Sequence, residues 1–148
     1  MKYNIKQYIV INKAAKWTAG KYASQVAHAS MAVMFQYLKR GFTRGVHFEG
    51  NITYEQVHYE MDVPIDIDAW IQGSFAKIIL KDEGILGIYD LEDHAKQLGI
   101  PTALIKDSGV TQELEDNEQG QTLAIGPFDT SNPKYEKLMV HISKFKLY

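Results

Sequence analysis

The chain contains no cysteine. Disulfides, and metal or redox sites built on thiolates, are therefore excluded. It also lacks an apolar run of membrane-spanning length, a signal-peptide pattern and an Arg/Ser-rich transit segment. From these absences we expect a protein that has no membrane partner and works in the cytoplasm.

An excess of positive charge is missing as well, because the net charge is −2 at pH 7. Nucleic-acid binders usually have a basic balance, so any contact with RNA has to come from local patches. Residues 1–44 have no acidic side chain but carry eight basic ones: Lys2, Lys6, Lys13, Lys16, Lys21, Lys39, Arg40 and Arg44. This run is either an ordinary solvated face or a positive surface around residue 21.

The length of 148 residues and the hydrophobic content of 45% are those of one globular domain. Residues 5–11 form a nearly continuous apolar run, which predicts a first strand. Thr18 is a predicted N-cap for a long helix over residues 19–39. Its predicted core face follows 3–4 spacing and consists of Ala23, Ala27, Ser30, Met34 and Tyr37.

Further along, a short helix is predicted over 66–72 and strands over 76–80, 102–106 and 122–126. A helical stripe runs through Ile88, Leu91, Ala95 and Leu98, so residues 76–106 form a predicted parallel βαβ unit. Asn132-Pro133 begins a last helix that reaches about residue 142. The predicted fold is α/β, with a small mixed four-stranded sheet and helices on both faces.

Residues 41–70 fit this alternation least well and form an insertion-like segment within a single domain, 1–148. A β-hairpin that turns near Gly50-Asn51 is one interpretation of this segment. The sequence leaves the oligomeric state open between a monomer and a homodimer.

A Gly-Lys pair, Gly20-Lys21, lies where the first strand leads into the long helix. A nucleotide-binding P-loop is disfavoured, because Ala15 replaces its first glycine and Tyr22 its hydroxyl residue. A helix N-terminus beside a lysine still favours an anion or a developing oxyanion. Lys21, Gln25 and His28 share one helix stripe, which is either part of a cleft or an ordinary polar face.

The strand over 102–106 leads into a turn crowded with acceptors and hydroxyls, namely Asp107, Ser108, Thr111 and Gln112. Ligands of open α/β sheets gather at the carboxyl ends of strands, and this turn follows such an end. The alternative is an Asx-turn that merely ends the strand. If the first and third strands are neighbours, Lys21 and Asp107 converge.

Other catalytic patterns are weak. The five histidines, His28, His47, His58, His94 and His141, show no metal-binding spacing, so we expect no metal site. The serines lack the G-x-S-x-G elbow of a Ser-His-Asp hydrolase.

Five stretches together resemble the archaeal/eukaryotic-type (type 2) peptidyl-tRNA hydrolase family. They are "GKYASQVAHASMAV", "AKIILK", "HAKQLGIPTALIKDSGVTQ", "QTLAIGPFD" and "VHISKFKLY". The resemblance is carried most specifically by the GK-x-x-x-Q-x-x-H helix start, by I-x-D-x-G-x-T-Q and by A-I-G-P. Only residues 41–70 lack an obvious counterpart.

The resemblance implies hydrolysis of the ester that links a peptide to the terminal ribose of tRNA, without metal or organic cofactor. The family's functional residues fall on Lys21, Gln25, Asp107 and Thr111, and its helix histidine falls on His28. Lys13, Lys16, Ser108 and Gln112 are additional candidates for substrate contact. The partner is then peptidyl-tRNA, and Lys21 serves a phosphate or the ester oxyanion.

Two departures from the family pattern bear on the substrate. Val110 occupies a position where the family commonly has arginine, and the segment after Gln112 is strongly acidic through Glu113, Glu115, Asp116 and Glu118. Acidic residues beside a cleft repel phosphates. The sequence therefore leaves two alternatives, a relative that hydrolyses another ester or amide and a non-enzymatic binding protein on the same scaffold.

Overall fold

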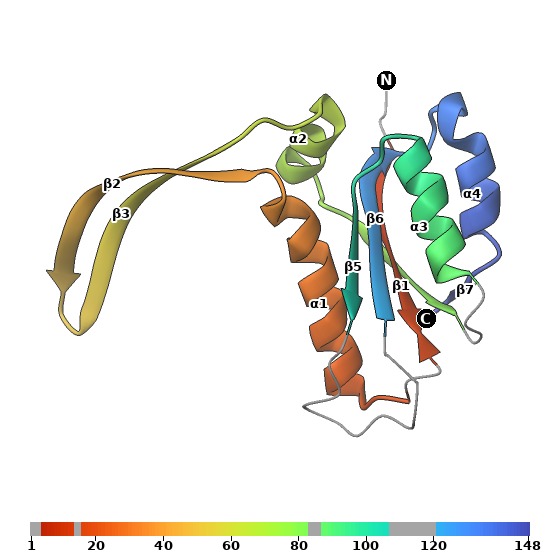
Figure 1. Ribbon diagram of the computed structural model, residues 1–148, viewed down its shortest axis with the longest axis horizontal. Coiled ribbons are helices and arrows are strands. Elements are labelled where there is room, and N and C mark those ends of the chain that lie inside the picture. Colours follow the sequence, from red (N-terminus) through yellow and green to blue (C-terminus); the bar gives the residue numbers. More distant parts are fainter. Residues whose placement is uncertain (1–3, 14–15, 83–86, 107–120) are drawn as a thin grey trace.

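The structure is a computed structural model that describes residues 4–13, 16–82, 87–106 and 121–148. Strands and helices alternate along most of the chain (Figure 1). The elements are β1 (Ile5–Asn12), α1 (Ala19–Phe35), β2 (Leu38–Glu49), β3 (Ile52–Met61), α2 (Ile65–Gln72), β4 (Lys77–Asp82), α3 (Ile88–Gln97), β5 (Thr102–Lys106), β6 (Gln121–Asp129), the 3₁₀ turn η2 (Pro133–Tyr135), α4 (Glu136–Ile142) and β7 (Lys146–Leu147).

The main sheet has the strand order β5-β6-β1-β4-β7. β1 and β4 are parallel, whereas β6 is antiparallel to both β1 and β5, and β7 is antiparallel to β4. The prediction of a mixed α/β sheet is confirmed. The predicted number of four strands is wrong, because the two residues Lys146–Leu147 add a fifth strand that is too short to show a period.

The unit formed by β4, α3 and β5 returns to the sheet in the same direction, as predicted. Its two strands are not adjacent, because β1 and β6 lie between them. β6 also separates β1 from β5, so the first and third predicted strands are not neighbours. They remain parallel to each other, because each is antiparallel to β6.

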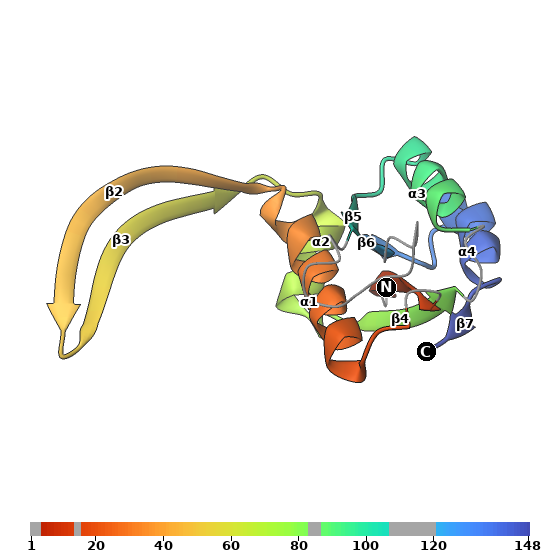
Figure 2. The ribbon, with the colours of Figure 1, turned by 60° about the horizontal axis from the view of Figure 1, so that its bottom comes forward.

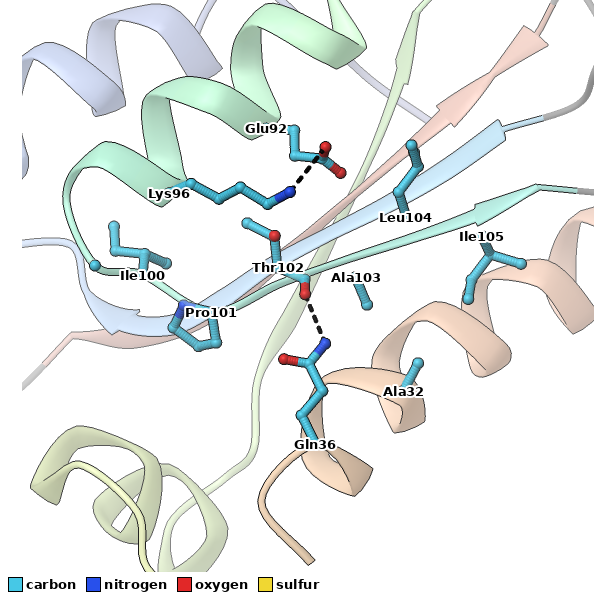
Figure 3. A pocket seen from close by; sticks show the side chains of 11 residues that line it. Ala32, Gln36, Glu92, Lys96, Ile100, Pro101, Thr102, Ala103, Leu104 and Ile105 are labelled. Carbon is cyan, nitrogen blue, oxygen red and sulfur yellow. Dashed lines mark hydrogen bonds and ion pairs between the residues drawn. The ribbon is translucent and has the colours of Figure 1, made fainter.

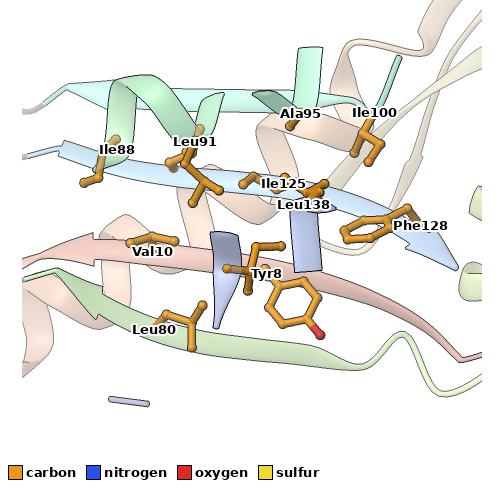
Figure 4. Close-up of a cluster of buried hydrophobic side chains, with 12 residues drawn as sticks. Tyr8, Val10, Leu80, Ile88, Leu91, Ala95, Ile100, Ile125, Phe128 and Leu138 are labelled. Atoms are coloured by element: carbon orange, nitrogen blue, oxygen red, sulfur yellow. The ribbon is translucent and has the colours of Figure 1, made fainter. Parts of the chain in front are cut away.

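Helices cover both faces of the sheet (Figure 2). Successive residues of β1 therefore pack on opposite sides. Tyr8 and Val10 join the cluster beneath α3 and α4, together with Leu91, Ile125 and Leu138 (Figure 4). Ile9 packs on the other face with residues of α1. Burial of both faces explains why the strand is continuously apolar.

Helix α1 begins as predicted, with Thr18 as N-cap. It ends at Phe35 rather than at residue 39, because the chain turns into β2 at Leu38. The predicted core face is wrong at Ala23 and Ala27, which are exposed. The buried positions include Tyr22, Ala29 and Val33. Side chains with more apolar surface gain more from burial, so these residues set the face that meets the sheet.

Strands β2 and β3 form a long antiparallel hairpin that projects from the end of α1, away from the rest of the molecule (Figures 1 and 2). Its turn lies at Gly50-Asn51, as predicted, and Gly50 has the positive φ of 58° that glycine adopts readily. Every residue from Lys39 to Gln56 is exposed. We call residues 38–61 the arm and the other described residues the sheet body.

Candidate active site at the carboxyl edge of the sheet

The ends of two strands and the start of one helix lie at the same edge of the sheet. The carboxyl ends of β1 and β5 lie there because both strands run antiparallel to β6. Helix α1 starts at this same edge, after the short connection from β1 (Figure 1). This is the edge at which open α/β sheets bind ligands.

The start of α1 is fixed by hydrogen bonds from both sides. The Lys21 backbone N donates to Thr18 Oγ1 over 3.3 Å, and the Tyr22 N donates to the Thr18 carbonyl over 3.0 Å. The backbone N of buried Trp17 donates to the Tyr22 hydroxyl over 3.0 Å. Lys16, just before, is exposed and has a φ of 50°, which costs a non-glycine residue about 1 kcal/mol. The first turn therefore has a fixed position and carries the partial positive charge of a helix N-terminus.

A groove of about 640 Å³ runs between α1 and β5 from this edge. It is lined by Gln25, Ala27, His28, Met31, Ala32, Phe35, Ile105 and Lys106. The groove thus brings two residues of the predicted helix stripe, Gln25 and His28, to the end of β5. Lys21 lies one turn before Gln25 on α1, and its Nζ is 5.8 Å from the centre of the Trp17 ring.

Gln25 is the most unusual residue of this groove. Only 6% of its surface is exposed, and among the described residues no donor reaches its Oε1. A buried carbonyl oxygen without a hydrogen bond costs about 1–3 kcal/mol. Because Gln25 also lines the groove, its amide is placed to bond a group that enters there.

Asp107, Ser108, Thr111 and Gln112 lie outside the described residues. The described part of β5 ends at Lys106, which lines the groove and pairs in register with Gln121, the first residue of β6. The Lys106 Nζ lies 6.0 Å from the centre of the Tyr89 ring.

The basic residues of the first 44 positions do not form one surface. Lys39 and Arg40 lie on the arm, at the other end of α1, and make ion pairs with Asp62 at 3.6 Å and Glu55 at 3.5 Å. Lys13 lies at the end of β1, and its Nζ is 3.4 Å from the Tyr148 hydroxyl. Of the two alternatives for this run, a single positive surface around residue 21 is wrong for the arm residues, because β2 places them at the opposite end of α1.

A second groove, of about 840 Å³, follows the free edge of β5 toward α3 (Figure 3). Three of its polar side chains, Gln36, Lys96 and Glu92, are already paired. The Gln36 amide donates to the Thr102 carbonyl over 2.7 Å, and Lys96 pairs with Glu92 over 3.2 Å. This groove lacks an unpaired polar atom comparable to Gln25 Oε1 in the described part of the chain.

Sequence reasoning missed the contribution of Lys106, and it missed Met31 and Phe35. The available signal for Met31 and Phe35 was two large apolar residues four positions apart on the predicted helix. Within the described ranges, no three His, Asp or Glu side chains are grouped so as to hold a metal ion. In those same ranges, no helix is both long and apolar enough to span a membrane.

Comparison with known proteins identifies the family. The family described as Peptidyl-tRNA hydrolase PTH2 matches residues 5–147, which is nearly the whole chain. The chain belongs to this family, and the prediction made from its motifs is confirmed.

Its curated relatives include archaeal proteins named peptidyl-tRNA hydrolase. The protein from Thermococcus onnurineus is 31% identical over 110 residues, which cover 74% of this chain and 75% of the relative. The protein from Methanopyrus kandleri is 29% identical over 122 residues, covering 82% and 84%. The protein from Haloquadratum walsbyi is 31% identical over 128 residues, covering 86% and 90%.

Proposed function

We propose that this protein is a peptidyl-tRNA hydrolase. Water attacks the carbonyl carbon of the ester, the bond to the ribose oxygen breaks, and the peptide leaves with a free carboxyl group. The ribose oxygen takes up a proton, so the tRNA is released with its terminal hydroxyl. Family membership supports the reaction, and the roles below need neither a metal nor an organic cofactor.

We assign the chemical step to Asp107, Thr111, Lys21 and Gln25. Asp107 orients or deprotonates the attacking water, directly or through Thr111. Lys21, Gln25 and the first N–H groups of α1 stabilise the negative charge that develops on the carbonyl oxygen. The observation that carries this proposal is the buried Gln25 side chain, which lines a groove that ends at Lys106, the residue before Asp107, and whose Nε2 group is the donor for the oxyanion.

We assign tRNA contacts to His28, Lys13, Lys16, Ser108 and Gln112. His28 lines the groove beside Gln25 and is exposed. Exposed Lys16 immediately precedes the start of α1, where the helix dipole adds to its attraction for a phosphate. Lys13 Nζ already lies over the Tyr22 ring at 4.3 Å, so a phosphate has to draw it from this contact. We therefore expect a larger loss of tRNA affinity from Lys16→Ala than from Lys13→Ala.

Turnover of peptidyl-tRNA by Asp107→Asn tests the catalytic assignment. Asparagine keeps the shape but cannot accept the proton, so kcat falls about 100- to 10,000-fold while tRNA affinity changes little. Asp93→Asn is the matched control, because Asp93 is an exposed aspartate on α3, away from the groove. An Asp107→Asn rate equal to that of the wild type removes Asp107 from the mechanism.

A salt titration separates peptidyl-tRNA from a different ester or amide substrate. Each neutralised phosphate contributes a slope of about −0.7 to −0.9 in log K against log salt. Replacing Glu113, Glu115, Asp116 and Glu118 by their amides should tighten tRNA binding at low salt and leave the chemical step unchanged. Binding that does not depend on salt, or that stays undetectable in this variant, contradicts the tRNA assignment.

We further propose a cytoplasmic location, where peptidyl-tRNA arises during translation, and a homodimer as the assembly. The arm supports the homodimer because Val46 and Phe48 are 58% and 74% exposed on a two-stranded ribbon, which is marginally stable alone. Light scattering should give a mass twice the chain mass of 16.8 kDa. The double variant Val46→Ser/Phe48→Ser should give the mass of a single chain. A wild-type mass of one chain rejects the homodimer.

A further inference from the structure

The groove between α1 and β5 changes from polar to apolar along its length. Its polar lining residues are Gln25 and His28 on the first half of α1 and Lys106 at the end of β5. Further along α1 the lining residues are Met31, Ala32 and Phe35, whereas Ile105 lies next to Lys106 on the strand. We call Met31, Ala32 and Phe35 the apolar end of the groove.

The direction of this change is fixed by the packing of α1 against β5. Gln36, one residue beyond the helix, donates to the carbonyl of Thr102, the first residue of β5. The helix therefore runs antiparallel to the strand, and its end lies beside the start of β5. The polar end of the groove faces the carboxyl edge of the sheet, and the apolar end points away from it.

The apolar end leaves large side chains open to solvent. Met31 and Phe35 are 49% and 55% exposed although they line a hollow surface. Apolar side chains gathered around a concavity are typical of a ligand site, with a few polar groups to orient the ligand. Here the Gln25 amide is such a polar group, because Gln25 lines the same groove and no described residue donates to its buried Oε1.

We propose that the apolar end binds the side chain of the amino acid whose carboxyl group is esterified to tRNA. This inference rests on the proposed function, because it takes the reacting ester to lie near Gln25. Helix rise places the level of Met31 about 9 Å beyond Gln25 and that of Phe35 about 15 Å beyond it. Apolar atoms in contact are about 4 Å apart, so the roughly 9 Å between the levels of Gln25 and Met31 leaves room for a side chain of several carbons.

The terminal adenine of tRNA fits the apolar end less well. An adenine ring carries several nitrogen atoms that need hydrogen-bond partners when they leave water. Met31, Ala32 and Phe35 offer no polar side-chain atom that can bond them. An apolar side chain has no such need, and the flexible thioether of Met31 adapts to side chains of different shape.

The proposal is tested by the hydrolysis of three substrates that share the same tRNA and differ only in the amino acid. The tRNA carries N-acetyl-leucine, N-acetyl-phenylalanine or N-acetyl-glycine, and kcat/KM is measured for wild type, Met31→Ser and Phe35→Ser. We expect the wild type to prefer leucine and phenylalanine over glycine by about tenfold, the low end for burial of a few carbons. Each variant should lose most of this preference while its rate on the glycine substrate stays within twofold.

Val140→Ser is the matched control. Val140 is 59% exposed, like Phe35, but it lies on α4 across the sheet, so its substitution should leave the preference intact. A loss of the same size on all three substrates in Phe35→Ser points to the adenine and overturns the proposal. Unchanged preferences in both groove variants overturn it as well.

A binding measurement tests the site even if no peptidyl-tRNA is hydrolysed. The probes are the stable amide analogues, 3′-(N-acetyl-leucyl)amino-3′-deoxyadenosine and its glycyl counterpart. The Met31 methyl resonance should shift with the leucyl probe and much less with the glycyl probe. Equal shifts with both probes reject the side-chain site, whereas hydrolysis tests the proposed function separately.

Discussion

Ile9, Val10 and Ile125 have no exposed surface, whereas every residue from Lys39 to Gln56 is exposed. Ile9, Val10 and Ile125 belong to the sheet body, where side chains pack on both faces of the strands. The arm is held mainly by its own backbone ladder and by cross-strand stacks such as Phe42–His58 and His47–Tyr54. One chain thus contains a region stabilised by burial and a region stabilised by pairs at its surface.

The comparison implies a division of labour. The groove with Gln25 and His28 lies entirely in the sheet body. An active site needs side chains that stay in place to within a fraction of an ångström, and burial supplies that rigidity. An exposed two-stranded ribbon does not, so we expect the chemistry to depend on the sheet body alone.

The largest difference between the regions should appear in kcat when one basic residue of each region is replaced by alanine. Lys21→Ala removes a cation from the start of α1 and should lower kcat about 100- to 1,000-fold, as the loss of one oxyanion donor typically does. Arg44→Ala removes a cation from the arm and should change kcat less than twofold. Turnover of peptidyl-tRNA at saturating substrate measures kcat for both variants. A comparable loss of kcat in the two variants contradicts the claim that the chemistry depends on the sheet body alone.

The second effect concerns stability. Leu123 is fully buried in β6, so Leu123→Ala should lower the free energy of unfolding by about 2–5 kcal/mol. Ile52→Ala, at a position 56% exposed on the arm, should cost less than about 1 kcal/mol. Urea unfolding followed by tryptophan fluorescence is a suitable measurement, because both tryptophans, Trp17 and Trp70, are buried in the sheet body. Equal losses contradict the proposed difference in stabilisation.

These differences also explain what the sequence could predict. β1 was predictable because burial on both faces makes it continuously apolar. Thr18 and Asn132 were predictable because their side chains accept backbone N–H groups, Thr18 at the start of α1 and Asn132 at the start of η2, the 3₁₀ turn that leads into α4. The hairpin turn was indicated by Gly50-Asn51 alone. The strand order was not predictable, since pairing with β6 depends on contacts between distant parts of the chain.

The candidate site was predictable to a similar degree. Spacing on a helix placed Gln25 and His28 on one stripe, and both line the groove. Spacing could not show that Gln25 is buried without a partner, because that depends on the sheet against which α1 packs. It also could not separate Lys39 and Arg40 from the helix start, because the turn from α1 into the arm lies where a continuous helix was predicted. The roles of Lys21, Gln25, Asp107 and Thr111 stay predictions.

A third, intermediate effect concerns a buried polar pair in the sheet body. Ser30 Oγ donates to Gln7 Oε1 over 2.6 Å, and Gln7 Nε2 donates to the Gly126 carbonyl over 3.1 Å. Ser30→Ala leaves Gln7 Oε1 without this donor and should cost about 1–3 kcal/mol of unfolding free energy. Ser24→Ala, an exposed position on the same helix, should stay within about 0.5 kcal/mol of wild type. Similar urea midpoints for the two variants reject the buried pair as a source of stability.

The smallest effect should come from pH, and it acts on the sheet body through α3 and α4. The Nδ1 atoms of His94 and His141 lie 3.0 Å apart, so one imidazole N–H donates to the other ring. Burial, followed by the nearby charges of His94 and Lys144, lowers the pKa of His141 from its usual 6.5, and Asp90 only partly opposes this.

Because the pKa of His141 is lower in the folded state, the unfolded chain binds more protons as the pH falls below about 6.5. The contribution to stability is therefore complete above that pH and is lost as the pH falls through the folded-state pKa. Urea unfolding at a series of pH values should show this decline in wild type and a shallower one in His141→Phe, which cannot take up the proton. Parallel curves for the two proteins would exclude His141 as the source.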